Sequence, residues 1–371
     1  ADAGQQVLWI ENTVKEAQQR YLDLAARAAE LGVACGLLHS RFTMSDRARI
    51  EAHWVDAFGK PGWSGRVERG RILVGTQVLE QSLDIDADFL VSRFAPTDML
   101  LQRMGRLWRH GKTPRAPGAQ CEAWLLAPEL AATIEAPPSA FGASAYVYSP
   151  YVLCRSLEVW QGRSAVSLPT DIRPLIEATY ADREEEGPMA RWLRDLDDGT
   201  SQPKRVGRKA LQQLARIGLA TEGKTLPEAQ AQTRYSESDS FEVLLLRDLQ
   251  IIPGENATRL TLLDGRTLRL PHRRNELDKP QWRSLTAQLM QQLVPVRPGE
   301  APLTVARDTL EKHGLQHCFY LGDPNWADDE SLLRVALVDD TRTLRGLHGA
   351  AVHDKHTLEY RDDLGYRVVK A

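Results

Sequence analysis

The sequence has little cysteine and no long hydrophobic run, and both absences exclude whole classes of protein. Its 371 residues include four cysteines, at positions 35, 121, 154 and 318, and none of them forms a C-x-x-C pair. This spacing argues against a disulfide framework and a cysteine-based zinc site, and it fits a reducing compartment. No stretch approaches the roughly 18 apolar residues of a membrane span, and no signal peptide is visible. We therefore expect a cytoplasmic protein without membrane contact.

The sequence also lacks an excess of charge of one sign. Its 47 Lys and Arg residues against 50 Asp and Glu residues give a net charge of −3. The chain is therefore not a basic coat for nucleic acid, and any nucleic-acid contact must be local. The densest basic cluster comprises Arg103, Arg106, Arg109, His110, Lys112 and Arg115.

Two nucleotide-binding motifs are missing as well. The chain contains no G-x-x-x-x-G-K-[ST] loop to cradle phosphates, and no D-E-x-H/D segment that would hold magnesium. The nearest approach to a metal-binding motif is His353-Asp354-Lys355-His356, which lies in a short polar stretch without further His or Asp ligands. We expect a solvated turn there, and no metal site.

One stretch, residues 71–112, carries most of the functional information. Residues 71–75 and 88–92 are short apolar runs that predict two buried strands. Pro96-Thr97 is typical of a helix start, with Thr97 as the N-cap, and His110-Gly111 is typical of its end. On such a helix Gln102, Arg106 and Arg109 would share a stripe roughly 60° wide, with Gly105 beside it. Two guanidiniums one turn apart suit a phosphoryl group in transfer, although an ordinary solvated basic face is the plainer interpretation.

The rest of residues 1–128 predicts strands that alternate with helices. Apolar runs at 7–10, 33–38 and 121–126 predict further strands, and helices are expected at about 14–31 and 45–58. This alternation indicates an α/β fold with a parallel sheet flanked by helices. Ligands of such sheets bind beyond the carboxyl ends of the strands. Three polar segments follow strands in this way: Asn12-Thr13, His39-Ser40-Arg41 and Thr76-Gln77.

These three segments have two interpretations. They could form a track for a phosphate backbone, or they could be caps and turns. Thr13 with Glu16 forms a capping box, so capping explains at least part of its presence. For the His-Ser-Arg segment we favour function, because an exposed loop of this composition offers hydrogen-bond donors that no cap requires.

Taken together, these motifs resemble a known enzyme family. The order strand, TQVLEQSLDID, strand, QRMGRLWR resembles motifs V and VI of superfamily 2 helicases. The residues EQSLDID, followed by QRMGRLWRH, resemble the corresponding motifs of the CRISPR-associated helicase–nuclease of type I systems. VLWIENTVKEAQ and LLHSRFTMSDRARIE resemble the second RecA-like domain of that family. Ser82 departs from many RNA helicases, which have Gly there, and this weakens an RNA-helicase interpretation.

The resemblance implies roles for individual residues. Gln102, Arg106 and Arg109 would be catalytic and would face the phosphates of ATP across an interdomain cleft. Asp84 and Gly105 would lie near the nucleotide. Contacts to single-stranded DNA are implied for Asn12, Thr13, His39, Ser40, Arg41 and Thr76. ATP with Mg²⁺ would be bound mainly by an N-terminal half that this sequence does not include, so we expect the chain alone to be inactive.

The pattern along the chain predicts three regions. Residues 1–128 would form the second RecA-like domain. Residues 129–235 would be a largely helical linker, beginning with a connector rich in Ala, Pro, Ser and Gly. Residues 236–371 would form a small α+β accessory C-terminal domain, with a hairpin whose two-residue turn is Asp264-Gly265. The chain begins without Met and resembles a piece of something longer.

Three hypotheses for function follow. In the first, the chain is the C-terminal part of a 3′-to-5′ translocase on single-stranded DNA, used in type I CRISPR interference in a prokaryotic cytoplasm. It would act with an N-terminal half that carries the P-loop and a His-Asp nuclease, and with a guide-RNA surveillance complex at an R-loop. In the second, it belongs to another superfamily 2 DNA or RNA helicase. In the third, it is a non-catalytic module that binds DNA or protein.

Overall fold

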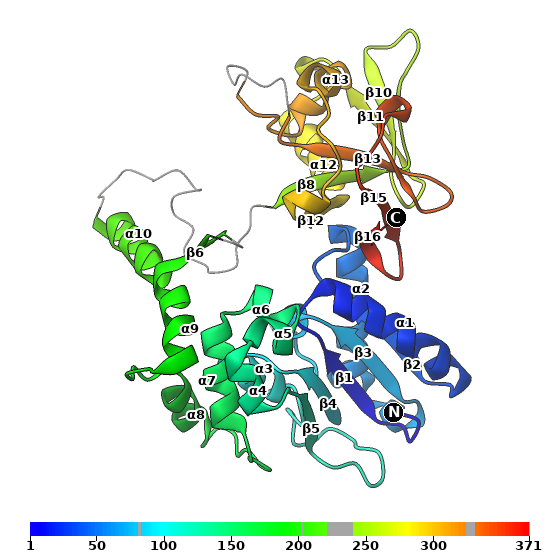
Figure 1. The fold of residues 1–371 in the computed structure, drawn as a ribbon. Coiled ribbons are helices and arrows are strands. Elements are labelled where there is room, and N and C mark those ends of the chain that lie inside the picture. Colours follow the sequence, from blue (N-terminus) through cyan, green and yellow to red (C-terminus); the bar gives the residue numbers. More distant parts are fainter. Residues whose placement is uncertain (81–82, 202–203, 221–239, 324–330, 371) are drawn as a thin grey trace. The chain divides into compact units, whose positions relative to one another are not determined.

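The computed structural model describes residues 1–80, 83–201, 204–220, 240–323 and 331–370 (Figure 1). The chain forms two compact units. The N-terminal unit comprises Ala1–Gly36 and Trp54–Glu237, and the C-terminal unit comprises Leu37–His53 and Ser238–Ala371. The predicted division at residues 128 and 235 stays a prediction.

A five-stranded parallel sheet forms the centre of the N-terminal unit. Its strands are β1 (Gln6–Ile10), β2 (Ala34–Leu38), β3 (Arg71–Gly75), β4 (Phe89–Arg93) and β5 (Glu122–Leu126). Their order in the sheet is β2-β3-β1-β4-β5, and the registered pairs are parallel. Central strand β1 is covered on both faces, and its Leu8 and Ile10 are fully buried. The predicted α/β fold, a RecA-like parallel sheet flanked by helices, is confirmed.

The two helices predicted before residue 60 are present. They are α1 (Val14–Glu30) and α2 (Met44–Phe58). Thr13 is the N-cap of α1: its side chain accepts a hydrogen bond from the Glu16 amide and donates one to the Glu16 carboxylate. Gly32 follows α1 with a φ of +68°, a conformation that glycine adopts without strain.

The predicted helix from residue 97 to residue 110 is wrong in its length and in its cap. Helix α3 spans Thr97–Met104 and ends at Gly105, and its N-cap is Pro96. Glycine is the poorest helix former after proline, so Gly105 lowers the cost of leaving the helix. Beyond it the backbone of residues 106–108 pairs with Ala87 instead of continuing the helical ladder. Gln102, Arg106 and Arg109 therefore do not lie on one helical stripe.

The helices from α4 to α9 share one apolar core with α3. They are α4 (Leu130–Glu135), α5 (Pro137–Phe141), α6 (Ser144–Val147), α7 (Pro150–Trp160), α8 (Ile172–Tyr180) and α9 (Gly187–Asp198), and α10 (Arg208–Ala220) follows them. A small pair of strands, β6 (Gly199–Ser201) and β7 (Lys204–Val206), lies between α9 and α10. Leu100 and Leu101 of α3 pack in the same cluster as Phe141, Leu157 and Trp160. The stretch 128–150, expected to begin a largely helical linker, contains the three short helices α4 to α6, and its assignment as a linker stays a prediction.

Among the described residues, the C-terminal unit contains three small sheets. Strands β8 (Phe241–Leu246), β12 (Leu293–Val296), β13 (Arg334–Val338) and β14 (Leu344–Arg345) form the first, in the order β12-β8-β13-β14. Strands β9 (Asp248–Ile251), β10 (Ala257–Thr261) and β11 (Thr267–Pro271) form the second, and β15 (His356–Arg361) with β16 (Gly365–Lys370) the third. Helices α12 (Lys279–Met290) and α13 (Arg307–Lys312) complete this α+β unit.

Two local predictions in this unit can be compared with the structure. Trp282, Leu285 and Leu289 form the buried stripe of α12, as their spacing predicts. The predicted hairpin is present between β10 and β11, but its turn is longer than two residues. Leu262 and Arg266 still pair, and the Gly265 amide donates to the Leu262 carbonyl. Gly265 has a φ of +87°, which is typical of the last residue of a three-residue turn.

Short 3₁₀ turns connect these elements. They span Lys60–Trp63, Arg66–Glu68, Gln77–Leu79, Arg274–Glu276, Pro298–Glu300, Leu315–His317 and Leu347–Gly349.

Candidate nucleotide and nucleic-acid site

Residues 105–115, here called the arginine segment, form an extended loop fixed to the sheet. The Ala87 amide donates to the Arg106 carbonyl at 2.8 Å, and the Trp108 amide donates to the Ala87 carbonyl at 3.0 Å. Trp108 has a φ of +49°, which turns the chain out of this short pairing. The two predicted catalytic arginines lie on either side of that bend.

Arg106 is held by the loop that precedes β4. Its two Nη atoms donate to the carbonyls of Leu83, at 2.8 Å, and Glu80, at 2.6 Å. Its Nε is buried and has no hydrogen-bond partner among the described residues. Burial, together with the nearby Arg109, lowers the pKa of the Arg106 guanidinium. Arg106 can reach a phosphate only if its hydrogen bonds to these two carbonyls are broken.

Arg109 pairs with the carboxylate that was predicted to lie near the nucleotide. Its Nε lies 3.2 Å from the Asp84 Oδ1, and the His110 Nε2 lies 2.9 Å from the same oxygen. The side chains of Arg109 and Asp84 are 38% and 54% exposed. An ion pair this exposed contributes little to stability, so an incoming anion can displace Asp84 at small cost. Gln102, on α3, is also exposed.

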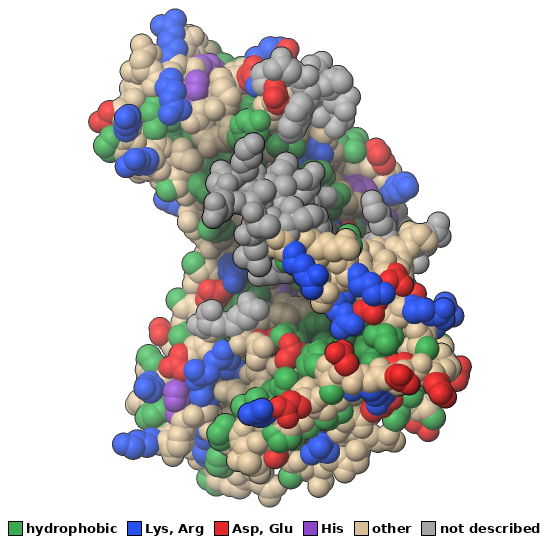
Figure 2. Space-filling model, turned by 90° about the vertical axis from the view of Figure 1, so that its left-hand side faces the viewer, with side chains coloured by type: hydrophobic (Ala, Val, Ile, Leu, Met, Phe, Trp, Pro, Cys, Tyr) green, Lys and Arg blue, Asp and Glu red, His purple; other side chains and the backbone are tan. Residues whose placement is uncertain are grey.

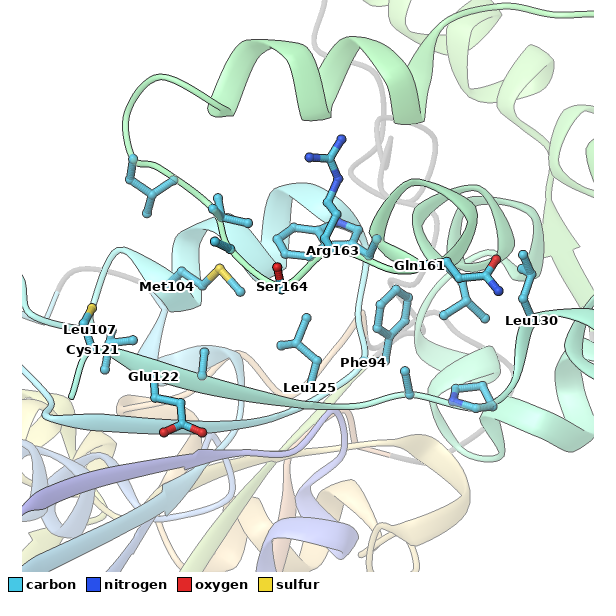
Figure 3. Close-up of a pocket in the computed structure, with 18 of the residues that line it drawn as sticks. Phe94, Met104, Leu107, Cys121, Glu122, Leu125, Leu130, Gln161, Arg163 and Ser164 are labelled. Atoms are coloured by element: carbon cyan, nitrogen blue, oxygen red, sulfur yellow. The ribbon is translucent and has the colours of Figure 1, made fainter. Parts of the chain in front are cut away.

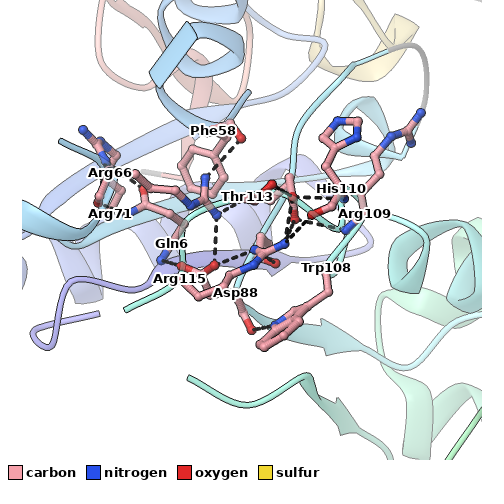
Figure 4. A network of polar contacts seen from close by, with 12 residues as sticks. Gln6, Phe58, Arg66, Arg71, Asp88, Trp108, Arg109, His110, Thr113 and Arg115 are labelled. Carbon is pink, nitrogen blue, oxygen red and sulfur yellow. Dashed lines mark hydrogen bonds and ion pairs between the residues drawn. The ribbon is translucent and has the colours of Figure 1, made fainter. Parts of the chain in front are cut away.

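Two buried aspartates fix the far end of the arginine segment (Figure 4). Asp86 accepts hydrogen bonds from the amides of Arg109 and His110, each at 3.1 Å, and from the Thr113 hydroxyl. Arg115 bridges Asp86 and Asp88 at 2.8 Å and 2.6 Å. The fully buried Arg66 also donates to Asp88, at 3.0 Å. The three aspartates of LDIDAD therefore have different roles. Asp84 is exposed to solvent, whereas Asp86 and Asp88 fix the arginine segment.

Arg103, which the sequence presents only as a member of the basic cluster, is fully buried and bonds to several residues. Its Nε lies 2.6 Å from Glu80 Oε1, and its Nη1 donates to the Ser92 hydroxyl and the Arg93 carbonyl, both at 2.9 Å. Burial raises the pKa of Glu80, although the adjacent Arg103 opposes this. Replacing either partner would leave a buried charge unpaired. Its spacing, three residues after Leu100 and four before Leu107, puts it beside the apolar face of a helix, and this signal could have indicated an inward side chain.

Arg103 also binds the predicted DNA contact Asn12. The Asn12 Oδ1 accepts from Arg103 Nη2 at 2.9 Å, and its Nδ2 donates to the Phe94 carbonyl and the Ser144 hydroxyl. Asn12 and Thr76 are 2% and 3% exposed. The Asn12 side chain thus has its hydrogen bonds within the protein, whereas Thr13 beside it is partly exposed. The DNA-binding roles of all three stay predictions.

The expected exposed His39-Ser40-Arg41 loop is only partly exposed. His39 is fully buried, Arg41 is 14% exposed at its side chain, and Ser40 is exposed. The prediction that the whole loop offers free donors is therefore wrong, because residues of the C-terminal unit bond to His39 and Arg41. Their roles in DNA binding also stay predictions.

A cavity of about 780 Å³ borders the arginine segment on its apolar side (Figure 3). Residues of β5, α7 and 161–168 line more than half of it, and the other lining residues include Phe94, Leu130 and, next to the arginine segment, Met104, Leu107 and Trp108. Arg106 and Arg109 are not among the lining residues, so this cavity is distinct from the predicted phosphate-facing site.

Lys and Arg side chains are interspersed with Asp and Glu over the face seen in Figure 2, in line with the near-neutral net charge.

Within the described ranges, no cluster of three or more His, Cys, Asp or Glu side chains could hold a metal. The His353 imidazole caps its own turn by accepting from the amides of Lys355 and His356. Among the helices that the structure describes, none is long and apolar enough to cross a membrane. Gln81 and Ser82 lie outside the described residues.

Comparison with known proteins identifies relatives of this chain. Residues 3–112 match the family model described as CRISPR-associated nuclease/helicase Cas3, C-terminal. The CRISPR-associated endonuclease/helicase Cas3 of Escherichia coli K12 is 33% identical over 235 residues, which are 61% of this chain and 25% of that protein. The Thermus thermophilus protein of the same description is 36% identical over 185 residues, covering 49% of this chain and 18% of that protein. The chain thus spans a quarter or less of the length of these relatives.

Two solved structures are also similar. The crystal structure titled T. fusca Cas3-ATP matches 98% of this chain and 38% of that chain, with 25% identity and a TM-score of 0.68. A structure titled CRISPR RNA-guided surveillance complex, pre-nicking, matches 98% of this chain and 41% of that chain, with 26% identity and a TM-score of 0.59. The family resemblance predicted from the sequence is confirmed.

Proposed function

From the premise that this chain corresponds to the C-terminal half of the Cas3 helicase–nucleases, we propose that it is part of an ATP-dependent helicase that moves along single-stranded DNA. In this proposal it supplies arginine fingers and part of the DNA track, and it translocates 3′ to 5′. A separate N-terminal half supplies the P-loop and the His-Asp nuclease.

One observation carries the proposal: two arginines are fixed in place beside one exposed carboxylate. Arg109 pairs with Asp84, and Arg106 lies close enough to both for their charges to affect its pKa. Around them the backbone is fixed by Ala87 and Asp86, so the guanidiniums are placed by the fold rather than by chance. Once released from Asp84 and from the carbonyls of Leu83 and Glu80, the two guanidiniums can stabilise the charge on a phosphoryl group in transfer.

The residues present fit a phosphate rather than a metal. Guanidinium and amide groups, such as those of Arg109 and Gln102, donate hydrogen bonds to phosphate oxygens. ATP with Mg²⁺, held mainly by the N-terminal half, would supply the transferable phosphoryl group and the hydrolysis energy. The task of this chain would be to exchange Asp84 for that phosphate at Arg109, and to release Arg106 from its two carbonyls.

The proposed partners follow from the same premise. Single-stranded DNA would pass Thr13, Ser40, Arg41 and Thr76, and the enzyme would unwind target DNA and help to degrade it. A guide-RNA surveillance complex at an R-loop would recruit it, a proposal supported by the similar structure whose title names such a complex.

The test of the arginine fingers uses the chain assembled with a P-loop-bearing N-terminal half. Arg106→Ala and Arg109→Ala should each reduce DNA-stimulated ATP turnover by about 10³-fold or more, while DNA affinity changes little. Lys112→Ala is the matched control, because it removes one positive charge from an exposed position of the same segment. If the two arginine variants retained wild-type turnover, the proposal would fail.

A second candidate, a non-catalytic module that binds DNA or protein, is favoured by the missing P-loop. ATP turnover of the chain alone and mixed with the N-terminal half separates the two functions. If the chain alone does not hydrolyse ATP but the mixture does, the helicase is supported. If neither hydrolyses ATP, the non-catalytic module is supported. Stimulation by RNA rather than DNA would instead favour another superfamily 2 helicase.

A further inference from the structure

The C-terminal hairpin of the chain contacts the His39-Ser40-Arg41 loop, and both belong to the C-terminal unit. Two backbone groups of the hairpin bond to this loop, one from the turn between β15 and β16 and one from β16. His39 Nε2 lies 3.1 Å from the Leu364 carbonyl, and the Tyr366 amide donates to the Arg41 carbonyl at 2.7 Å. A loop predicted to bind DNA is thus bonded to residues more than 300 positions further along the chain.

The His39 side chain serves this contact rather than solvent. Its Nδ1 accepts a hydrogen bond from the Arg41 amide at 3.1 Å, so the proton of the neutral ring is assigned to Nε2, which donates to Leu364. The ring is fully buried and stacks on Phe42 with a centroid separation of 4.5 Å. Both ring nitrogens of His39 therefore form hydrogen bonds within the protein.

Arg41 is held in a similar way. Its guanidinium forms an ion pair with Glu300, and the carbonyl of Glu300 accepts a hydrogen bond from the Tyr366 hydroxyl at 2.6 Å. The loop continues into Thr43, whose amide donates to the Tyr360 hydroxyl at 3.0 Å. Of the three loop residues, Ser40 alone is exposed.

We propose that the C-terminal hairpin positions this loop for DNA binding, and that Glu300 competes with DNA for Arg41. The turn at Leu364–Gly365 fixes the loop backbone so that Ser40 faces solvent, and Glu300 neutralises Arg41 until a DNA phosphate replaces it. This inference rests on the proposed function, because it requires the loop to contact the phosphate backbone of single-stranded DNA.

Gly365 provides the sharpest test. It has a φ of +68°, and a Cβ there would lie 2.5 Å from the Arg41 carbonyl oxygen and 2.9 Å from His39 Cε1. Gly365→Ala must therefore displace the loop or the turn. Gly265→Ala is the matched control: Gly265 also lies in a hairpin turn of this unit, has a φ of +87°, and has no atom within 4 Å of its Cβ position. Both variants carry similar backbone strain, and they differ in contact with the loop.

The measurement is the Kd for a fluorescent single-stranded oligonucleotide, with the chain assembled with its N-terminal half. We expect Gly365→Ala to weaken binding by about tenfold, and Gly265→Ala by less than about twofold. Equal Kd values for these two variants, both folded, would overturn the inference. A wild-type protein that binds no single-stranded DNA would instead overturn the proposed function.

Glu300→Gln gives a second readout, which decides the matter if Gly365→Ala does not fold. The change removes the negative charge beside Arg41, so binding should tighten and the slope of log Kd against log salt should steepen by about one ion. Glu255→Gln is its control, because it removes an exposed carboxylate of the same unit that pairs with Arg269. A Glu300→Gln slope equal to that of Glu255→Gln would overturn the inference.

Discussion

The arginine segment and the His39 loop are both predicted to serve the same reaction, yet they are held in place in opposite ways. The arginine segment is fixed mainly by residues within about 30 positions of it, such as Glu80, Asp86 and Ala87. The His39 loop is fixed by Glu300, Tyr360 and Leu364, which lie between 259 and 325 positions away. The arginine segment is therefore held by residues of its own motif, whereas the His39 loop is held by residues far away in the sequence.

This difference explains which parts of the site a sequence can reveal. The arginine segment and most of its hydrogen-bond partners lie together in residues 80–115, so this one stretch of sequence is enough to predict a phosphate site. The contacts of His39 connect segments with no visible relation in sequence. The C-terminal residues, which carry no recognisable motif, are thus part of the predicted DNA site.

The largest effect should come from breaking the local support. Asp86→Ala leaves the amides of Arg109 and His110 without their acceptor and Arg115 without one of its carboxylates. The loss should be about 3–5 kcal/mol, measured as the free energy of unfolding in urea. An unchanged midpoint would show that the network does not fix the arginine segment.

Acid should weaken the distant support. Burial lowers the pKa of His39 from 6.5 to about 3, so between these values the unfolded chain binds a proton that the folded chain does not. The stability contributed by the neutral ring is therefore complete above pH 6.5 and falls by about 1.4 kcal/mol per pH unit as the pH drops towards 3. His39→Gln, which cannot titrate, should show a shallower decline between about pH 7 and 5, and parallel curves would contradict the assignment.

A smaller effect is expected from one hydroxyl of the C-terminal unit. Tyr360→Phe removes the group that accepts from the Thr43 amide and donates to the Asp46 carboxylate. The cost should be about 1–2 kcal/mol, since a buried amide loses its partner. Tyr320→Phe is the control, because Tyr320 is 71% exposed, and its urea midpoint should not change.

The smallest effect on stability should follow Asp84→Asn. The exposed Asp84 pairs with Arg109, and such pairs contribute about 0–1 kcal/mol. The free energy of unfolding should therefore stay close to that of the wild type. A loss as large as that of Asp86→Ala would mean that Asp84 supports the fold rather than facing the nucleotide.

Much of the fold follows from local pattern. The five strands of the main sheet, α1 with its Thr13 cap, and the buried stripe of α12 are all visible as periodicity or capping signals. The end of α3 is not, because the pairing of Ala87 with Arg106 and Trp108 is a tertiary contact that overrides helical spacing. The partners of Arg103 are not visible either, because they come from separate parts of the N-terminal unit.

The core shared by α3 and the helices after it limits how this protein can be dissected. Phe94, Leu100 and Leu101 lie in one cluster with Trp160, Leu175 and Trp192. A fragment cut at residue 128 would expose the first three to water, at about 1.5–3 kcal/mol for each large side chain. Such a fragment would bear an apolar patch prone to self-association. Limited proteolysis should therefore leave a resistant piece of the N-terminal unit that extends through α9, past the end of the sheet.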